Sequence, residues 1–380
     1  MPAGRLYRLG RAYESQRRWD KAEHAYRAIL ASDDPNPQAL FRLGRVLERQ
    51  HRWPEAADAY RSALAIEERN KWLMRLGKVV ERSSREEARE IYEKLLERDP
   101  KSTELDRRLL KADSRRFPAR RRYVRFVGRH LDDIQERAAG FRFEPPTAPP
   151  RIWMYWAQGI EQAPPVVQLC QERLRHFHSS EEIVVLDEGS LEDYVEIPGV
   201  VRDRLAKNPT KLADVLRFEL LVRYGGVWLD ATCFPRERIL DRLPELLPSG
   251  FFAFRYRRAR ISSWMLAGEP NHPVLALTLA AQHVYWERFR RAIDYYVVHH
   301  LFEALYYLVD EFRAPVIATP WRSSHPPARF ARRMLEPYDA ALYKRLLEGS
   351  FIHKLSYKYP AGAATPDTLL GHLMRGEEPA

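Results

Sequence analysis

Hydrophobic positions in the first hundred residues follow a helical period, and the pattern repeats along the chain. A Leu-Gly pair recurs at spacings of 34 and 33 residues, and each pair is followed by a small residue and, four residues later, by a tyrosine. A period of this length is typical of a solenoid, because each pair of helices buries its apolar face against the next pair. The pattern predicts three helix pairs, marked by Leu9-Gly10, Leu43-Gly44 and Leu76-Gly77 and by Ala22 and Tyr26, Ala56 and Tyr60, and Ala88 and Tyr92.

This repeat resembles the tetratricopeptide repeat over residues 1–101. The third copy departs from it, because its inter-helix loop is one residue short and Val80 replaces the usual aromatic residue. The resemblance implies an all-α array whose concave surface binds a peptide or a protein partner. A packing platform for the rest of the chain is an equally weighted alternative, and the repeats alone name no ligand.

Residues 102–144 predict a helical connector with a basic stretch. Residues 115–125 carry six arginines with interleaved aromatic residues. Such a stretch can bind the phosphates of a nucleic acid or lie on an anionic membrane surface, but we favour a solvated helix face. The proline-rich segment 145–150 stops regular structure, so we place a linker between two domains there.

Beyond the prolines, strand and helix patterns alternate. Residues 151–156 and 183–187 predict buried strands, and residues 165–178 predict an amphipathic helix that opens on proline. Alternation of this kind indicates parallel strands joined by crossover helices. We expect an α/β domain over residues 151–360 and a C-terminal tail over residues 361–380.

Segment 211–232 is the most informative part of the chain. A helical pattern ends at two glycines, and a short buried strand follows, with Asp230 at its carboxyl end. Asp214 and Arg217 are three residues apart, so they share one face of the helix. Ligands of open α/β sheets bind beyond the carboxyl ends of the strands. Each of the three residues alone is explained by a surface ion pair or a capped turn. Together they favour a cleft for sugar hydroxyls, a diphosphate and a metal ion.

Here the chain resembles the capsular polysaccharide synthesis family, a group of glycosyltransferases similar to the family 32 sugar transferases and to the large clostridial toxin glucosyltransferases. The resemblance covers residues 151–359. It rests on Ile152-Trp153, Trp156, Asp214, Arg217, Gly225-Gly226 and Trp228-Leu229-Asp230-Ala231-Thr232.

The resemblance implies an α/β GT-A-type fold with a Rossmann-like mixed sheet, a nucleotide-sugar donor and glycosyl transfer with retention at the anomeric carbon. It implies that Asp214 and Arg217 hold the donor sugar and that Asp230 faces the ribose and a metal ion. The predicted catalytic residues are Asp214, Arg217 and Asp230. The predicted donor-binding residues are Trp156, Asp214, Arg217, Gly225, Gly226 and Lys358.

The wider superfamily has an Asp-x-Asp motif, whereas the second acid here is Thr232. A hydroxyl is a weak metal ligand, so the resemblance implies that another residue completes the site. By similarity we assign a divalent metal ion, Mn²⁺ or Mg²⁺, to Asp230, Thr232 and His353, and contact with the diphosphate to Lys358.

Composition limits the partners. The formal net charge of +11 and a sequence pI near 9.6 favour anionic partners. Two cysteines, Cys170 and Cys233, exclude a disulfide framework and a four-cysteine zinc site. The most apolar long stretch contains charged residues and falls short of a membrane span. We therefore expect a soluble cytoplasmic protein, with peripheral contact at the inner, anionic face of the membrane as an open possibility.

The leading hypothesis is a glycosyltransferase that extends a capsular or surface polysaccharide, with a glycan or a lipid-linked glycan as the acceptor. The alternative is a non-catalytic scaffold, in which the repeats bind a protein and a degenerate transferase domain docks. A nucleic-acid binder is disfavoured, because the chain has no recognisable nucleic-acid-binding motif.

Overall fold

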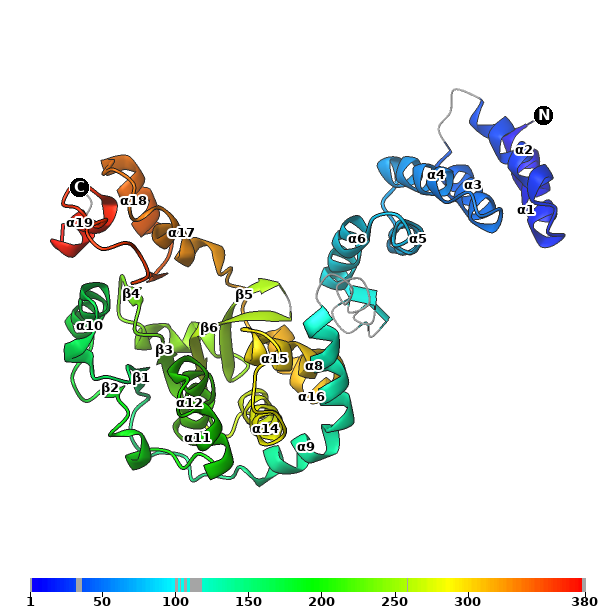
Figure 1. Cartoon of the computed structure of the whole chain (residues 1–380). Coiled ribbons are helices and arrows are strands. Elements are labelled where there is room, and N and C mark those ends of the chain that lie inside the picture. Colours follow the sequence, from blue (N-terminus) through cyan, green and yellow to red (C-terminus); the bar gives the residue numbers. More distant parts are fainter. Residues whose placement is uncertain are drawn as a thin grey trace. The chain divides into compact units, whose positions relative to one another are not determined.

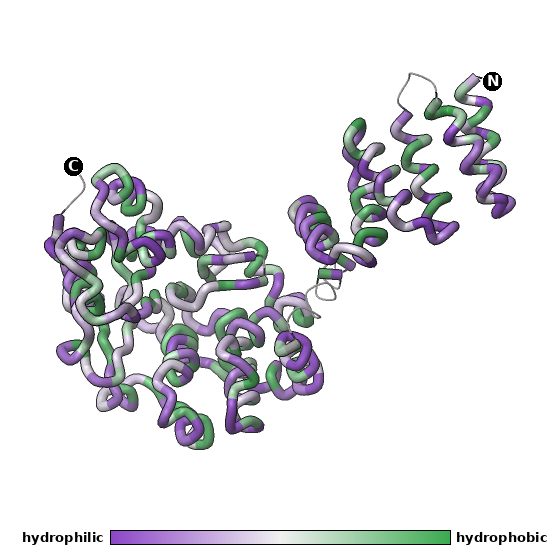
Figure 2. Tube along the Cα trace, turned by 45° about the horizontal axis from the view of Figure 1, so that its top comes forward, coloured by the Kyte–Doolittle hydropathy of each residue, from purple (hydrophilic) through white to green (hydrophobic). Residues whose placement is uncertain are grey.

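The computed structural model describes residues 2–31, 36–99, 102, 104–105, 108–109, 118–257 and 259–377. The chain divides into two compact units, residues 1–121 and 122–380, both drawn in Figure 1. Along the helices of the N-terminal unit, hydrophobic and hydrophilic positions alternate, as the packing of amphipathic helices requires (Figure 2).

Three helix pairs build the N-terminal unit, which confirms the predicted repeats. Within each pair the two helices pack against each other, and neighbouring pairs are also in contact. The helices are α1 (Ala3–Ser15), α2 (Trp19–Leu30), α3 (Pro37–Arg49), α4 (Trp53–Ile66), α5 (Asn70–Val80) and α6 (Arg85–Arg98).

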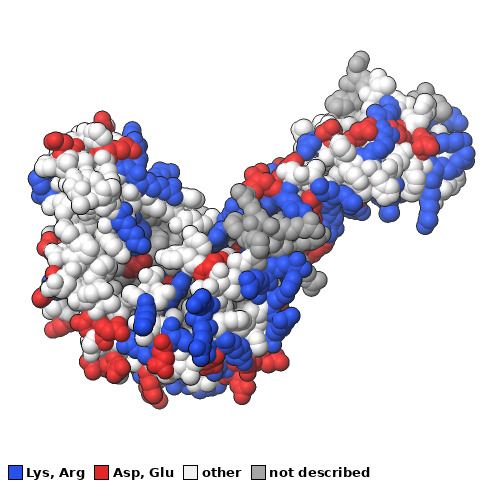
Figure 3. Space-filling model, in the orientation of Figure 1, with Lys and Arg blue, Asp and Glu red and all other residues white. Residues whose placement is uncertain are grey.

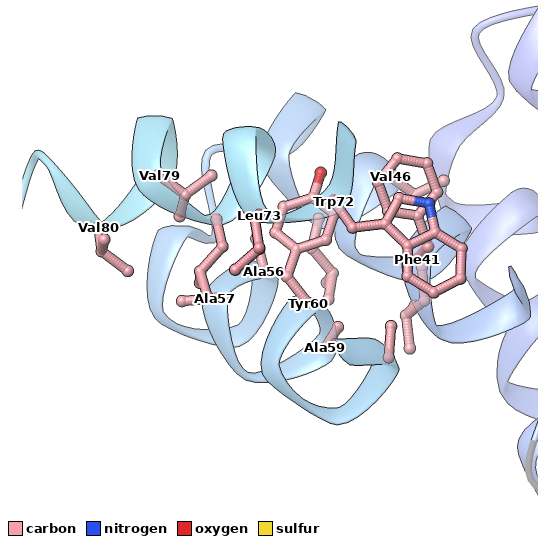
Figure 4. Packing of buried hydrophobic residues seen from close by; sticks show 14 of the residues in the cluster. Phe41, Val46, Ala56, Ala57, Ala59, Tyr60, Trp72, Leu73, Val79 and Val80 are labelled. Carbon is pink, nitrogen blue, oxygen red and sulfur yellow. The ribbon is translucent and has the colours of Figure 1, made fainter. Parts of the chain in front are cut away.

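A glycine and a tyrosine set the approach of the two helices in each pair. A Cβ atom added to Gly44 would lie 2.6 Å from the ring of Tyr60, and Tyr60 is fully buried. Gly10 faces Tyr26 and Gly77 faces Tyr92 in the same way. Beside Tyr60, the rings of Phe41 and Trp72 stack with their centroids 5.1 Å apart (Figure 4). The Leu-Gly and Tyr positions of the repeat are therefore one packing contact made three times.

Each of these buried tyrosines also has a polar partner at the same repeat spacing. The tyrosine hydroxyl donates a hydrogen bond to a glutamate at or just beyond the end of the preceding helix. An arginine that follows the tyrosine's own helix in the chain pairs with that glutamate. The hydrogen bonds are Tyr26–Glu14 (2.6 Å), Tyr60–Glu48 (2.8 Å) and Tyr92–Glu81 (3.0 Å), and the ion pairs are Arg42–Glu14 (3.4 Å), Arg75–Glu48 (3.1 Å) and Arg108–Glu81 (3.2 Å). The hydrogen bond gives each buried tyrosine hydroxyl a partner, and the ion pair links each repeat to the segment that follows it.

A five-stranded mixed sheet is the centre of the C-terminal unit, in the order β2-β1-β3-β6-β5. Strands β1, β2 and β3 are parallel, as the sequence predicts, whereas β5 and β6 form an antiparallel hairpin that the sequence analysis did not identify. The strands are β1 (Ile152–Tyr155), β2 (Ile183–Leu186), β3 (Gly226–Leu229), β5 (Phe251–Arg257) and β6 (Arg260–Gly268).

Helices cover both faces of this sheet. Helix α12 packs against β1, β3 and β6, and α14 and α15 extend that helical layer (Figure 1). On the opposite face, Met154 and Leu229 share a core cluster with Val167 of α10. The helices are α10 (Pro165–Phe177), α11 (Gly199–Leu205), α12 (Pro209–Tyr224), α13 (Leu243–Leu246), α14 (Pro273–Arg288), α15 (Val297–Leu308) and α16 (Asp310–Ala318).

A second, two-stranded sheet joins β4 (Cys233–Pro235) to β7 (Ile352–Lys354) in antiparallel register. Around it lie α17 (His325–Arg333), α18 (Ala340–Glu348) and α19 (Leu369–Met374). The predicted tail over residues 361–380 is wrong for its described part, because three leucines of α19 are buried in one cluster with Phe330 and Tyr343. Residues 378–380 lie outside the described residues.

The boundary between the units lies between Arg121 and Arg122, not at the proline-rich segment 145–150. Much of the predicted connector belongs to the C-terminal unit, since α9 (Leu131–Gly140) packs along α14. The backbone of Phe143 also donates to and accepts from the side chain of Asn271, at 2.9 and 2.8 Å.

Helix α8 (Pro118–Arg129) contains part of the predicted arginine run, and its Phe126 packs edge-on against Tyr285 of α14. Residues 115–117 of that run lie outside the described residues. Lys and Arg side chains are mixed with Asp and Glu on the surfaces of both units (Figure 3). Among the described helices, none has the length and apolar character needed to cross a bilayer.

Substituting Gly44→Ala tests the glycine–tyrosine contact. The added methyl group would push against the buried ring of Tyr60, and overpacking of this kind costs about 1–3 kcal/mol. We expect a lower midpoint for thermal unfolding of the helical repeats, followed by circular dichroism. The control is Gly4→Ala in α1, where a Cβ atom meets nothing within 4 Å. If both variants unfold at the wild-type temperature, the contact does not set the helix spacing.

Candidate active site

The candidate site lies where β3 ends. Asp230 follows the last residue of this strand, and its backbone N–H donates to the carbonyl of Trp264 on β6 at 2.8 Å. Its carboxylate is oriented by Trp228, whose indole Nε1 donates to Asp230 Oδ1 at 3.0 Å. The carboxylate is therefore held at the carboxyl edge of the sheet, where ligands of α/β folds bind.

Helix α12 brings two more charged side chains to this edge. Its N-terminus is capped by Asn208, and Asp214 and Arg217 lie one turn apart on the helix. Arg217 Nη2 is 3.2 Å from Asp214 Oδ1 and 3.5 Å from Asp230 Oδ1. The structure thus brings together the three residues that the sequence predicted to converge.

Besides its ion pairs, the Arg217 guanidinium is held in place by hydrogen bonds to two backbone carbonyls. Its Nη1 donates to the carbonyl of Ser263 on β6 at 2.7 Å, and its Nε donates to the carbonyl of Ala213 at 3.0 Å. Only 5% of the side chain is exposed. The guanidinium therefore holds Asp214 and Asp230 in position and has little surface left for a ligand.

Two lysines complete the cluster, and the sequence analysis gave a role to neither. Lys211 Nζ lies 3.1 Å from Asp214 Oδ2 and also donates to the carbonyl of Tyr295. Lys354 Nζ lies 3.1 Å from Asp230 Oδ2 and also donates to the hydroxyl of Thr232. The five charges alternate in sign and sum to +1; we call this set the charge row: Lys211, Asp214, Arg217, Asp230 and Lys354.

The sequence pattern could indicate the position of one of these two lysines but not of the other. Lys211 stands three residues before Asp214, so helical spacing alone places it on the same face. Lys354 is separated from Thr232 by 122 residues and reaches it only because β7 pairs with β4. No local pattern in the sequence indicates that pairing.

Mutual attraction keeps the exposed end of the charge row ionised. Burial would raise the pKa of Asp230, but Lys354 and Arg217 outweigh it and hold that pKa below its usual value. Burial would lower the pKa of Lys354, and the facing carboxylate of Asp230 raises it instead. Behind Arg217, burial and the nearby guanidinium lower the pKa of His299 to about 3, so this imidazole is neutral.

His353 does not lie with the charge row, contrary to its predicted role as a metal ligand. It is fully buried, its Nε2 donates to the carbonyl of Leu347 at 2.9 Å, and its ring packs near Phe330. Successive residues of a strand point to opposite sides, so Lys354 faces Asp230 while His353 faces the core. The imidazole of His353 is therefore held in the core, and the neighbouring Lys354 is the residue of this strand that lies beside Asp230.

The two glycines predicted to bind the donor have a structural role at the other end of the strand. Gly225 ends α12 with φ of 64°, and Gly226 starts β3 with φ of 90°. A Cβ atom on Gly226 would lie 2.3 Å from the carbonyl oxygen of Arg151. They shape the turn into β3, whereas the site lies where β3 ends.

Trp156 and Lys358 are the remaining predicted donor contacts. Trp156 follows β1 at the same sheet edge as Asp230, and its ring meets Tyr357 edge-on, with the centroids 5.4 Å apart. Lys358 Nζ lies 5.9 Å from the centre of the Tyr357 ring. None of the described contacts of Lys358 is with a residue of the charge row. The structure therefore places Trp156 at the edge of the site and leaves Lys358 without a link to it.

The side chains at the site do not fit the predicted divalent metal ion. Lys354 donates to Asp230 and to Thr232, the two predicted ligands that are present. Across the described ranges, no three His, Cys, Asp or Glu side chains are grouped so that they could hold a metal ion. Since an ammonium group and a divalent cation repel each other and compete for the same oxygens, no step proposed below passes through a metal.

Two family models match the chain. The model described as capsular polysaccharide synthesis protein matches residues 113–373, and the model described as tetratricopeptide repeat matches residues 7–72. A search of curated proteins finds no match.

Solved structures give partial matches. The crystal structure of MamA is 21% identical and matches 30% of this chain and 68% of its own, with a TM-score of 0.29. The first tetratricopeptide domain of Spaghetti (RPAP3), bound to an HSP90 peptide, is 25% identical over 30% of this chain and 90% of its own, with a TM-score of 0.28. A mutant of the Thermobaculum terrenum O-GlcNAc transferase is 19% identical over 49% of this chain and 36% of its own, with a TM-score of 0.27. At such scores these likenesses carry no argument.

The buried position of His353 predicts sensitivity to acid. Burial lowers its pKa from 6.5 to about 4, so below neutral pH the unfolded chain binds a proton that the folded chain does not. Stability then falls as the pH drops, by about 2 kcal/mol from this residue between pH 7 and pH 5. In His353→Gln, where the amide can still donate to Leu347, the acid-induced fall in unfolding temperature is expected to be smaller.

The matched control is His325→Gln, because His325 is exposed at the start of α17. This variant is expected to keep the wild-type acid sensitivity. An equal fall in all three proteins would show that His353 is not held neutral by the fold.

Proposed function

The chain belongs to the capsular polysaccharide synthesis protein family, and from this premise we propose that its C-terminal unit is a glycosyltransferase of GT-A type. It transfers a sugar from a nucleotide-sugar donor to a growing capsular or surface glycan, with a glycan or a lipid-linked glycan as the acceptor. The proposed fold type agrees with a mixed sheet that has its charged cluster at the carboxyl edge of parallel strands.

The charge row is the observation that carries this proposal. A nucleotide sugar has hydroxyl groups, which donate hydrogen bonds to carboxylates, and a diphosphate, which binds cations. The row offers both groups at one edge, with a net charge of +1. A surface ion pair needs no such chain of partners with a buried arginine at its centre.

Each member of the row has a separate proposed task. Asp214 and Asp230 accept hydrogen bonds from hydroxyls of the donor, and Arg217 positions both carboxylates. Lys354, with 25% of its side chain exposed, faces the diphosphate. Trp156 offers an apolar ring beside the donor at the end of β1.

An exposed aromatic ring lies on the other side of the row. Tyr295 is 62% exposed, and Lys211 Nζ lies 4.6 Å from the centre of its ring. Flat rings at the edge of a polar site suit the apolar face of a sugar ring. We assign Tyr295 to the acceptor side of the site.

The transfer breaks the bond between the anomeric carbon and the diphosphate oxygen, and that oxygen keeps the electron pair. The acceptor hydroxyl oxygen forms the new bond to the anomeric carbon, and its proton passes to the departing diphosphate. The reaction proceeds with retention when acceptor and leaving group lie on the same face of the sugar. Fixed cations at the diphosphate stabilise the charge that develops on it.

The helical repeats are proposed to bind a protein partner. A hollow on this unit is lined by charged side chains from α3, from α5 and the turn after it, from the start of α6 and from Arg108, together with Trp53. The guanidinium carbon of Arg82 lies 4.2 Å from the centre of the Trp53 ring. The charged residues of this lining are Glu48, Lys78, Glu81, Arg82, Arg85 and Arg108. A partner held there would bring the transferase to its acceptor.

The experiment is a screen of nucleotide-sugar donors with the full-length protein, measuring release of the nucleoside diphosphate. With the donor that is turned over, Asp230→Asn is expected to lower kcat/KM roughly a hundred- to thousandfold, because a charged hydrogen bond in the transition state is lost. The control is Asp203→Asn, an exposed carboxylate on α11. It should keep wild-type activity.

Two results would contradict the proposal. One is wild-type turnover in a folded Asp230→Asn. The other is the absence of donor binding and turnover across the whole panel, which would favour the alternative of a scaffold with a degenerate transferase domain.

A further inference from the structure

Lys354 lies where a divalent cation would have to bind. Its Nζ is 3.1 Å from Asp230 Oδ2, and it also donates to the hydroxyl of Thr232. These are the two oxygen donors of the Asp-Ala-Thr segment that follows β3. One ammonium group thus bridges the carboxylate and the hydroxyl that a metal would use.

The fold builds this contact through backbone pairing. Strand β7 pairs with β4 so that Lys354 lies opposite Cys233. The backbone N–H of Leu355 donates to the carbonyl of Thr232 at 2.8 Å, so the lysine and the threonine are joined through the main chain as well as through their side chains. The position of the ammonium group is therefore set by a sheet and not by a mobile loop.

Lys354 also has capacity for a ligand. An ammonium group has three N–H donors, and Lys354 uses two of them in its described contacts with Asp230 and Thr232. A quarter of its side chain is exposed, compared with 5% for Arg217, which is held by two carbonyls and two carboxylates. Of the two cations beside Asp230, Lys354 is the one that can reach an incoming anion.

We propose that Lys354 takes the place of the divalent cation, so that the C-terminal unit binds the donor diphosphate and releases it without a metal ion. This inference rests on the proposed function and specifies how the leaving group is stabilised. The ammonium charge neutralises the diphosphate as the bond to the anomeric carbon breaks, and Asp230 and Thr232 hold the lysine in place.

The test uses inorganic pyrophosphate as a probe that is independent of the unknown nucleotide base. Calorimetric titration of the full-length protein in chelator is expected to show binding, and electron paramagnetic resonance is expected to show that added Mn²⁺ alone stays free. Lys354→Met should weaken pyrophosphate binding in chelator at least tenfold. Lys354→Arg keeps the charge and should retain most of the binding, which separates loss of charge from misfolding.

The matched control is Lys207→Met, an exposed lysine in the turn after α11, which should bind pyrophosphate like the wild type. Pyrophosphate binding that requires Mn²⁺ and is unchanged in Lys354→Met would overturn the inference alone. Failure of pyrophosphate and of every donor in the screen to bind, with or without Mn²⁺, would overturn the proposed function and the inference with it.

Discussion

The salt bridges of Arg217 to Asp214 and Asp230 are the interaction on which the site depends. Two carboxylates at one sheet edge repel each other unless a cation lies between them, and this guanidinium also ties α12 to β6 through the carbonyl of Ser263. Leaving a buried charge without its partner costs about 3–5 kcal/mol. Helix position, carboxylate orientation and the charge balance of the site thus depend on one buried residue, and the two lysines extend the charge row on either side of it.

The helical repeats rely on a different constraint, which is steric. In each helix pair a glycine faces a tyrosine, and the buried tyrosine hydroxyl needs a carboxylate that accepts its hydrogen bond. Residues at the same repeat spacing make both contacts, so the fold of this unit is determined by residues that are close together in the sequence. The C-terminal unit instead depends on contacts between distant segments, such as Asn271 with Phe143 and β4 with β7.

That difference explains what the sequence could predict. The three helix pairs, the parallel strands and the convergence of Asp214, Arg217 and Asp230 follow from spacings within short segments. The hairpin β5–β6 and the contact of Lys354 with Asp230 depend on pairings that no local period reveals. His353 and Lys354 are neighbours in β7, and one residue along a strand reverses the side of the sheet that a side chain faces, so His353 lies in the core and Lys354 beside Asp230. The prolines at 145–150 predict a boundary, but the division lies between residues 121 and 122, because the chain before the prolines packs along α14.

The most direct measurement is a crystal structure of the full-length protein soaked with pyrophosphate and Mn²⁺, with diffraction data collected at the manganese absorption edge. We expect pyrophosphate oxygens within hydrogen-bonding distance of Lys354 Nζ, which still contacts Asp230, and no anomalous peak between Asp230 and Thr232. A manganese peak coordinated by these two residues, with Lys354 displaced from them, would contradict this expectation.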